Sequence, residues 1–296
     1  MPFSSIIDAC RRAARTPSVS FRAVFGHPRL SVNSISSYLQ PLSADLALWS
    51  DLGIEHVALI LPKIEEVGWD AARKMVTGAG LRVSTIFGPT NRPLDADHAL
   101  GWWDEDQQGT VDTVEFAASI GARSVYVCSG GAPTLTFDEA ADAFCELIAP
   151  AVARGNELGV PVLLEPTNPL RVDISFVLWQ RDAMDVARQA GTKVMLDLQS
   201  CWYERGLEPL VRKNIDLVGL TQISDFVIGT SQTGDRAVPG DGDIPLERLV
   251  GMVLDAGFEG SFDLEVMGPR VEAEGYHSSV RRSVERASEL LDRLGA

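Results

Sequence analysis

Eight short apolar runs rich in β-branched residues recur along the 296-residue chain, and seven of them are followed by a helical pattern. A strand buried on both faces is almost continuously apolar, whereas a helix places apolar residues three and four positions apart. Several runs begin just after a Gly at the position where a helix ends in a left-handed residue. The runs cover residues 30–36, 56–61, 81–88, 123–131, 160–168, 193–202, 215–225 and 261–269.

Local signals mark the ends of some of the predicted helices. Thr136 and Glu139 match the capping-box pattern, with apolar residues at helical spacing behind them. Asp243 is the expected N-cap of a later helix, because Pro245 would then lie in its first turn, where a missing N–H costs nothing. Gly257 is expected to stop that helix, and a last helix is predicted over about 276–293.

The alternation of strand and helix predicts a single-domain α/β protein. Parallel strands need helical crossovers, and eight such units close into a (β/α)8 TIM barrel, here over residues 30–296. The alternative is an open doubly wound sheet, which normally shows a Gly-rich phosphate turn, and the chain has no GxGxxG or Walker pattern. Residues 1–29 are predicted to form a short N-terminal helical extension.

Composition narrows the classes of partner. The net charge of −15, with dispersed basic residues, argues against nucleic acid. No apolar run approaches the roughly 20 residues of a membrane span, and the N-terminus lacks the long apolar segment of a signal peptide. We therefore expect a cytoplasmic protein that does not bind membranes. Its four widely spaced Cys fit free buried thiols. The sequence leaves a homo-oligomer open.

Four successive strands each carry one oxygen-bearing side chain near the predicted carboxyl end, where TIM barrels hold their active sites. These side chains are Glu165, Asp197, Gln222 and Glu265. Each alone also fits a polar strand end. Together, three buried carboxylates without a basic residue in the strand cores need a compensating cation. An oxygen-rich set of this kind favours Mn²⁺ or Mg²⁺ over Zn²⁺.

The motifs around these residues resemble the xylose isomerase-like barrel superfamily, specifically its sugar phosphate isomerase/epimerase group. The resemblance covers most of residues 30–293 and implies one catalytic divalent metal ion held by Glu165, Asp197, Gln222 and Glu265. It also implies that Glu165 and Glu265 move protons on opposite faces of a small carbohydrate-like substrate, through a metal-stabilised enediolate. The motifs are "LLEP" at 163–166, "MLDL" at 195–198, "QISD" at 222–225, "RAVPGDGDIP" at 236–245 and "DLEVMGP" at 263–269.

The resemblance implies further substrate contacts and also shows two departures. Arg236 stands where the family places an Arg that binds substrate oxygens. Ser200 replaces a His of the ketose epimerases, and Arg171 replaces a Glu, so a plain ketose 3-epimerase is not expected. Arg171 would suit an anionic group, or it is a solvated loop residue. Trp202 would form an apolar wall of the pocket or belong to the core, and His277 could reach the barrel mouth.

Two other polar residues draw attention next to predicted strands. Lys63 follows the second strand and is interpreted as a solvated loop residue, with entry into the mouth as the alternative. Asp225 is expected to hold the loop after the seventh strand and, through it, Arg236.

The function predicted from the sequence is a metal-dependent sugar isomerase or epimerase. Two alternatives stay open: a dehydratase or lyase with the same enediolate chemistry, similar to inosose dehydratases, and a non-catalytic barrel that binds a small molecule. An endonuclease IV activity is not expected, because its trinuclear zinc site is rich in His and this chain has four His in all.

Overall fold

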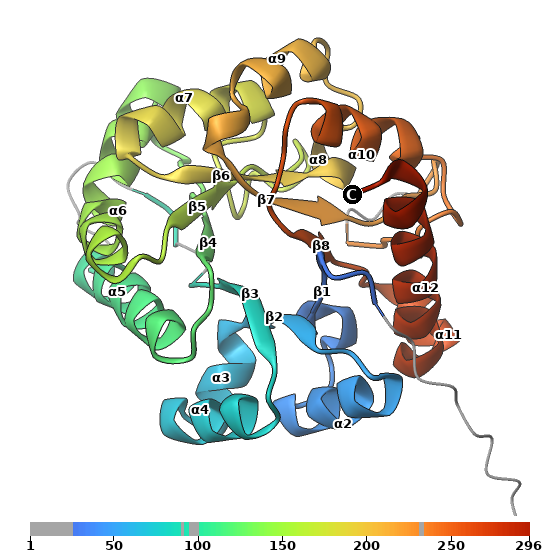
Figure 1. The fold of residues 1–296 in the computed structure, drawn as a ribbon. Helices are drawn as coiled ribbons and strands as arrows, with labels where there is room; N and C mark the ends of the chain where they lie inside the picture. The colour runs from blue at the N-terminus through green and yellow to red at the C-terminus, as the bar shows by residue number, and fades with distance from the viewer. Residues whose placement is uncertain (1–25, 90–91, 95–100, 231–233) are drawn as a thin grey trace, which may run out of the picture.

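The computed structural model describes residues 26–89, 92–94, 101–230 and 234–296. Its strands pair in parallel and in chain order to form a closed barrel, in which β1 also pairs with β8 (Figure 1). The predicted TIM barrel is therefore confirmed. Most of the predicted N-terminal extension lies outside the described residues. The strands are β1 Leu30–Asn33, β2 His56–Ile60, β3 Arg82–Phe87, β4 Val125–Cys128, β5 Val162–Glu165, β6 Lys193–Asp197, β7 Val218–Ile223 and β8 Phe262–Leu264.

Helices surround the barrel on its outside (Figure 1). Each predicted apolar run contains one strand, and the strands are shorter than the runs because several runs continue into short helices. The α-helices are α2 Leu42–Leu52, α3 Leu61–Val67, α4 Trp69–Gly78, α5 Trp103–Ser119, α6 Phe137–Leu158, α7 Gln180–Ala190, α8 Leu198–Cys201, α9 Leu207–Lys213, α10 Leu246–Asp255, α11 Pro269–Glu274 and α12 Tyr276–Leu294. The 3-10 helices are η1 Ser34–Ser37 and η2 Ile215–Leu217.

The predicted helix ends have mixed outcomes. The capping box at the start of α6 is confirmed, because the Thr136 side chain accepts from the Glu139 amide and the Glu139 side chain accepts from the Thr136 amide. The predicted N-cap Asp243 is wrong: α10 begins three residues later, and Pro245 is its N-cap residue. The Asp243 carboxylate instead accepts a hydrogen bond from the Ile228 amide at 2.8 Å, so a contact across the loop replaces the local cap.

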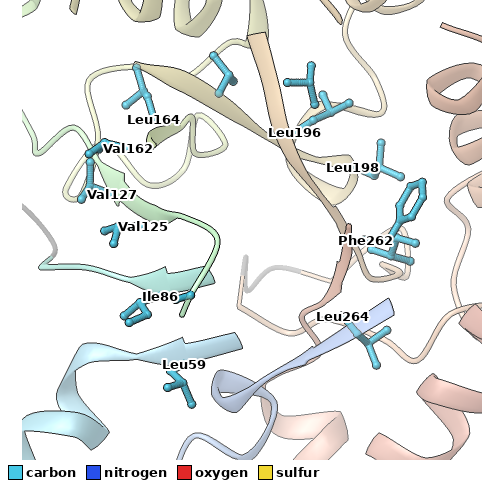
Figure 2. Close-up of a cluster of buried hydrophobic side chains, with 14 of the residues drawn as sticks. Leu59, Ile86, Val125, Val127, Val162, Leu164, Leu196, Leu198, Phe262 and Leu264 are labelled. Atoms are coloured by element: carbon cyan, nitrogen blue, oxygen red, sulfur yellow. The ribbon is translucent and has the colours of Figure 1, made fainter. Parts of the chain in front are cut away.

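The alternation of side chains along each strand divides the apolar residues into two clusters. The larger cluster lies between the barrel and the helices, and its labelled strand residues point away from the barrel axis in Figure 2. The smaller cluster, made of Tyr126, Leu163, Met195 and Leu220 with Phe87 packed against it, fills the inside of the barrel. Because alternate residues face opposite sides of a strand, the inner face continues two residues beyond each of these positions.

The described residues contain no helix that is both long and apolar enough to cross a membrane. None of the cysteines within them is in a disulfide: Cys128 and Cys201 are buried, as expected, whereas Cys145 is partly exposed.

Candidate functional site

The polar end of the barrel follows directly from the strand alternation. Glu165, Asp197 and Gln222 stand two residues after the inner residues Leu163, Met195 and Leu220, on the same face of β5, β6 and β7. Asp197 and Gln222 are register partners of β6 and β7. Glu265, which follows β8, completes the group, and all four side chains are buried.

Arg236 supplies the positive charge at this end of the barrel. Its guanidinium forms a bidentate ion pair with Asp197, in which Nη1 and Nη2 lie 3.2 and 3.0 Å from the two carboxylate oxygens. Nη2 also lies 3.0 Å from Glu265 Oε1, and Nη1 donates to Ser224 Oγ at 2.9 Å. Burial alone would lower the pKa of Arg236, but Asp197 and Glu265 outweigh it and raise that pKa, so the guanidinium stays charged.

Asp225 holds the loop that carries Arg236, as the sequence predicted. Its carboxylate accepts hydrogen bonds from four loop amides, those of Phe226, Gly240, Gly242 and Ile244. A Cβ atom at Gly242 would overlap the Asp225 carboxylate, so this approach requires a glycine. The Arg236 amide also donates to the Met267 carbonyl after β8 at 2.9 Å, which joins the loop to the next strand.

The Asp197 carboxylate is fully engaged. Besides Arg236, its Oδ1 accepts from the Gln199 amide at 3.0 Å and its Oδ2 accepts from Ser200 Oγ at 2.7 Å. Four donors occupy the lone pairs that a carboxylate offers. Ser200 therefore serves as a support for Asp197.

Gln222 has a contrasting environment. Its Nε2 donates to Glu265 Oε2 at 2.5 Å and to Asp263 Oδ2 at 3.3 Å. Its Oε1 is buried and has no hydrogen-bond partner. Buried polar atoms are nearly always paired, so an unpaired carbonyl oxygen at the end of a barrel strand indicates a position that a ligand completes.

The carboxyl groups of Glu165 and Glu265 both favour a bound proton. Burial, followed by the negative charges of Glu265 and Asp197, raises the pKa of Glu165 well above its usual range. Burial also raises the pKa of Glu265 to about 7, against the opposing effect of Arg236. The cluster thus contains more carboxylates than its one guanidinium neutralises, which is a common property of functional sites.

A cavity of about 250 Å³ opens above these residues. Glu165, Glu265, Arg236, Arg171 and Ser200 all line it, so the structure brings most of the predicted site residues together. Its apolar lining includes Ile35, Phe87, Ile174 and Met267.

Two predicted site residues lie elsewhere. Trp202 packs against the outer apolar cluster and makes an edge-to-face contact with Tyr203, which agrees with the core alternative. His277 lies on α12 with its Nε2 3.0 Å from Asp51 Oδ2 on α2, and neither residue lines the cavity. Arg171 is partly exposed and pairs with Asp173 at 2.9 Å, at the rim of the cavity.

The expectation for Lys63 is wrong in both versions. The side chain is buried, and its Nζ donates to the Ser34 and Ser37 carbonyls at 2.8 and 2.9 Å and to Asp45 at 2.7 Å. This ammonium thereby holds η1 against α2 and α3. It is a structural residue that neither meets solvent nor lines the cavity.

The side chains at the end of the barrel match a divalent cation only in part. Within the described parts of the chain, no group of three or more His, Cys, Asp or Glu side chains stands close enough together to hold a metal ion. The Arg236 guanidinium lies between Asp197 and Glu265 instead. Two observations do fit a cation: the unpaired Gln222 Oε1 and the surplus of buried carboxylates. The donor atoms are of the kind that a hard divalent ion prefers, but their placement, with Arg236 between two of them, forms no ready metal site.

Sequence reasoning missed two inner residues. Asp263 lies on β8 two positions before Glu265, which follows the strand, and Cys128 stands two positions after Tyr126 on β4. The Cys128 thiol lies 3.6 Å from Glu165 Oε2. The two-residue alternation around Glu265 was the signal that could have identified Asp263.

A family model described as a xylose isomerase-like TIM barrel matches residues 46–294. The chain belongs to this family. No curated protein matches its sequence.

Solved structures of similar barrels agree with the fold of this xylose isomerase-like chain. A protein from Sinorhizobium meliloti 1021 is 22% identical with a TM-score of 0.76, covering 89% of this chain and 98% of that one. The IolI protein, solved with a bound zinc atom, is 14% identical with a TM-score of 0.72, covering 90% and 99%. D-psicose 3-epimerase from Clostridium cellulolyticum is 14% identical with a TM-score of 0.67, covering 90% and 98%. At these identities the likeness shows the fold alone.

Proposed function

We propose that this protein is a divalent-metal-dependent isomerase or epimerase of a sugar or a sugar-derived hydroxy-ketone. The observation that carries the proposal is the pair of buried carboxyl groups, Glu165 and Glu265, which line one cavity and both have raised pKa values. They stand at the ends of β5 and β8, which are not neighbours in the barrel, so they approach a bound molecule from different sides. A general acid–base pair that works at neutral pH needs pKa values raised towards neutrality and access to two sides of the substrate.

The proton moves between carbon and carboxyl groups. One ionised carboxylate takes the proton from the carbon beside the substrate carbonyl, and the electron pair moves onto the carbonyl oxygen to give an enediolate. The other carboxyl group, protonated, returns a proton to the opposite face or to the neighbouring carbon. The donors of Arg236 lie beside Glu265 and line the cavity, where they can also bind substrate oxygens.

Glu165, Asp197, Gln222 and Glu265 are the residues that would hold the divalent ion, with Mn²⁺ or Mg²⁺ preferred because the donors are all oxygens. When bound, the ion supplies Lewis-acid stabilisation of the negative charge that develops on the substrate oxygen. The neutral Gln222 amide adds a hard oxygen without another negative charge. The unpaired Oε1 supports this assignment.

Arg171, at the rim of the cavity, supports a proposal for the class of substrate. Arg171 lines the cavity, and its present partner Asp173 is largely solvent-exposed, so an anionic group of a substrate could replace that partner at low cost. We therefore propose a small carbohydrate-like substrate with a carboxylate or phosphate. Neighbouring apolar side chains, Ile35 and Ile174 among them, would contact its C–H groups.

The test is solvent proton exchange. The chain, loaded with Mn²⁺ in D₂O, should incorporate deuterium at the carbon beside the carbonyl of its substrate, and EDTA should stop the exchange. Glu165→Gln should reduce exchange by about 10²- to 10⁴-fold, the usual contribution of a proton-transferring side chain. His277→Gln is the matched control, because His277 lies outside the cavity, and it should exchange at the wild-type rate.

The results separate the alternatives. Exchange accompanied by loss of water would indicate a dehydratase or lyase that uses the same carboxyl pair. A purified chain that holds no divalent ion and exchanges no proton with any carbonyl sugar tested would reject the proposal. It would then favour a barrel that only binds a small molecule.

A further inference from the structure

Gln199 is a buried residue of the cavity wall, and its side-chain amide lacks a strong partner. It lies in α8, which follows β6 without a break, and it is 6% exposed. No residue within the described parts of the chain accepts a hydrogen bond from its Nε2. Its Oε1 lies 3.5 Å from Ser200 Oγ, but that hydroxyl donates its hydrogen to Asp197 at 2.7 Å. Because buried amides are nearly always paired, this one indicates a contact that a ligand completes.

The structural role of Gln199 belongs to its backbone. Its main-chain N–H donates to Asp197 Oδ1 at 3.0 Å, and this bond caps the start of α8. Arg236 Nη1 donates to the same oxygen at 3.2 Å. One carboxylate therefore fixes both the Gln199 backbone and the Arg236 guanidinium, whereas the Gln199 side chain makes no such bond. A substitution at this position keeps the main-chain N–H, and it should leave the pairing of Asp197 with Arg236 intact.

Two other buried glutamines show what sets Gln199 apart. Gln222 Oε1 and both amide atoms of Gln180 also lack partners, but these atoms are sealed from solvent, and neither residue lines the cavity. Gln199 Nε2 lacks a partner without belonging to this sealed group, and Gln199 does line the cavity. The accessible part of its amide is therefore the part that a molecule in the cavity would meet.

The chemistry of the amide selects the kind of group that it meets. An amide nitrogen donates two hydrogens and carries no charge, so it binds an oxygen that can accept. An anionic oxygen would be repelled by the carboxylate of Asp197, which holds the Gln199 backbone. A hydroxyl oxygen accepts the hydrogen bond without adding charge, and it is therefore the better partner.

We propose that Gln199 is a substrate-contact residue whose side-chain amide donates a hydrogen bond to a hydroxyl oxygen of a polyhydroxylated ligand in the cavity. The inference rests on the proposed function for its class of ligand. Removing the donor leaves that hydroxyl group unpaired in a site shielded from water, which should weaken binding by about 5- to 30-fold.

The contact is tested by binding of the D-2-ketohexoses and their 6-phosphates to the full chain, measured by ligand-observed NMR. Gln199→Leu keeps the approximate size of the side chain but removes the amide, and it should weaken binding of the tightest-binding ketose by about 5- to 30-fold. Gln180→Leu is the matched control, because Gln180 is a buried glutamine with an unpaired amide outside the cavity. Its affinity should stay within about 3-fold of the wild-type value.

Two further measurements separate a lost hydrogen bond from altered packing. Both leucine variants remove a buried polar group that has no strong partner, so neither should unfold at a lower urea concentration than the wild type. Monodeoxy analogues of the tightest-binding ketose then identify the hydroxyl group. The analogue that lacks the partner of Gln199 should bind to wild type and to Gln199→Leu with affinities that agree within about 3-fold. If Gln199→Leu does not fold, Gln199→Met takes its place, because an unbranched side chain adapts more easily to the site.

The outcomes distinguish the contact from the proposed function. Equal affinity of wild type and Gln199→Leu for the tightest-binding ketose would overturn the contact and leave the proposed function intact. The same conclusion would follow if Gln199→Leu weakened the binding of every monodeoxy analogue equally, because no single hydroxyl group would then depend on the amide. A wild-type chain that binds none of the ketoses or their phosphates would overturn the proposed function, and the role of Gln199 with it.

Discussion

Two buried clusters, one around Lys63 and one around Arg236, each contain one basic residue. They differ in how completely their polar atoms are paired. Around Lys63, the ammonium makes three hydrogen bonds and faces one carboxylate, that of Asp45, which Ser37 also contacts. Around Arg236, one guanidinium faces Asp197 and Glu265, with Glu165 and Asp263 buried close by, and Gln222 Oε1 has no partner. The first cluster is complete without a ligand, whereas the second is not.

This difference in pairing separates a structural ion pair, around Lys63, from the cluster that we propose as a ligand-binding site, around Arg236. Both clusters lie near the carboxyl ends of the strands, so position alone does not separate them. The balance of charge separates them, because Lys63 faces one acidic side chain, whereas Arg236 is surrounded by a surplus of acidic side chains. Variants that alter each balance provide a direct test of the comparison.

The largest effect is expected at Lys63. Lys63→Met leaves Asp45 buried without its cation, and should lower the free energy of unfolding by about 3–5 kcal/mol at pH 8. Urea unfolding measures this loss. Lys193→Met is the matched control, because Lys193 is exposed and its ammonium donates to the Asp216 carbonyl rather than to a buried acid, and it should change stability by less than about 0.5 kcal/mol.

The pH dependence of that loss has a definite sign. Burial raises the pKa of Asp45 from 3.8 to about 6, although Lys63 opposes the shift. A folded-state pKa above the unfolded value gives stability that is present below about pH 4 and lost as the pH rises through about 6. Removing Lys63 raises that pKa further, so the variant goes on losing stability above pH 6. The gap to wild type should be small at pH 5 and largest at pH 8, and an equal gap at both would contradict the pairing.

A smaller effect of opposite sense is expected at Arg236. Arg236→Gln removes the positive charge that occupies Asp197 and Glu265, so Mn²⁺ should bind about 10-fold more tightly, equivalent to about 1.4 kcal/mol. Substrate turnover should fall, because the variant loses donors that line the cavity. Arg171→Gln is the control, since its partner Asp173 lies outside the cluster, and its Mn²⁺ affinity should stay at the wild-type value. Unchanged or weaker Mn²⁺ binding in Arg236→Gln would show that the guanidinium and the ion do not compete.

The smallest change is a shift in metal preference at Gln222. Gln222→His replaces an amide oxygen with an imidazole nitrogen, which should favour Zn²⁺ over Mn²⁺ by several-fold relative to wild type. Competition with a chelating dye measures both affinities. Gln222→Leu, with no donor atom, should weaken Mn²⁺ binding by about 10-fold. If Gln222→Leu binds Mn²⁺ as wild type does, Gln222 is not a ligand and the second cluster is complete after all.

Much of the fold was predictable because its signals are local. The apolar runs and the glycines after helices identify the strands of the closed barrel, and the Thr136–Glu139 capping box is readable within four residues. The shared inner face of Glu165, Asp197 and Gln222 also follows from strand alternation. The role of Asp225 was predictable because its partners lie in the loop that follows it.

The incorrect predictions concern side chains whose partners are distant in sequence. Lys63 looked solvated because the carbonyls it contacts belong to η1, almost 30 residues earlier. Asp243 looked like a cap because its Ile228 partner lies across a long loop. The Arg236 guanidinium meets Asp197 from 39 residues away, and nothing in the sequence indicates that it would lie between two of the expected metal ligands.

The Asp225 clasp fixes the shape of the loop that follows β7, whereas other contacts fix its position. All of the amides that its carboxylate binds belong to this loop, and the Asp225–Ala237 backbone pairing closes it beside Arg236. The loop is anchored from outside at the Met267 carbonyl and at the α12 guanidinium groups that pair with Asp241. The same loop sequence grafted onto another barrel would therefore keep its shape, but it would deliver its arginine to the strand ends only where the host supplies equivalent anchors.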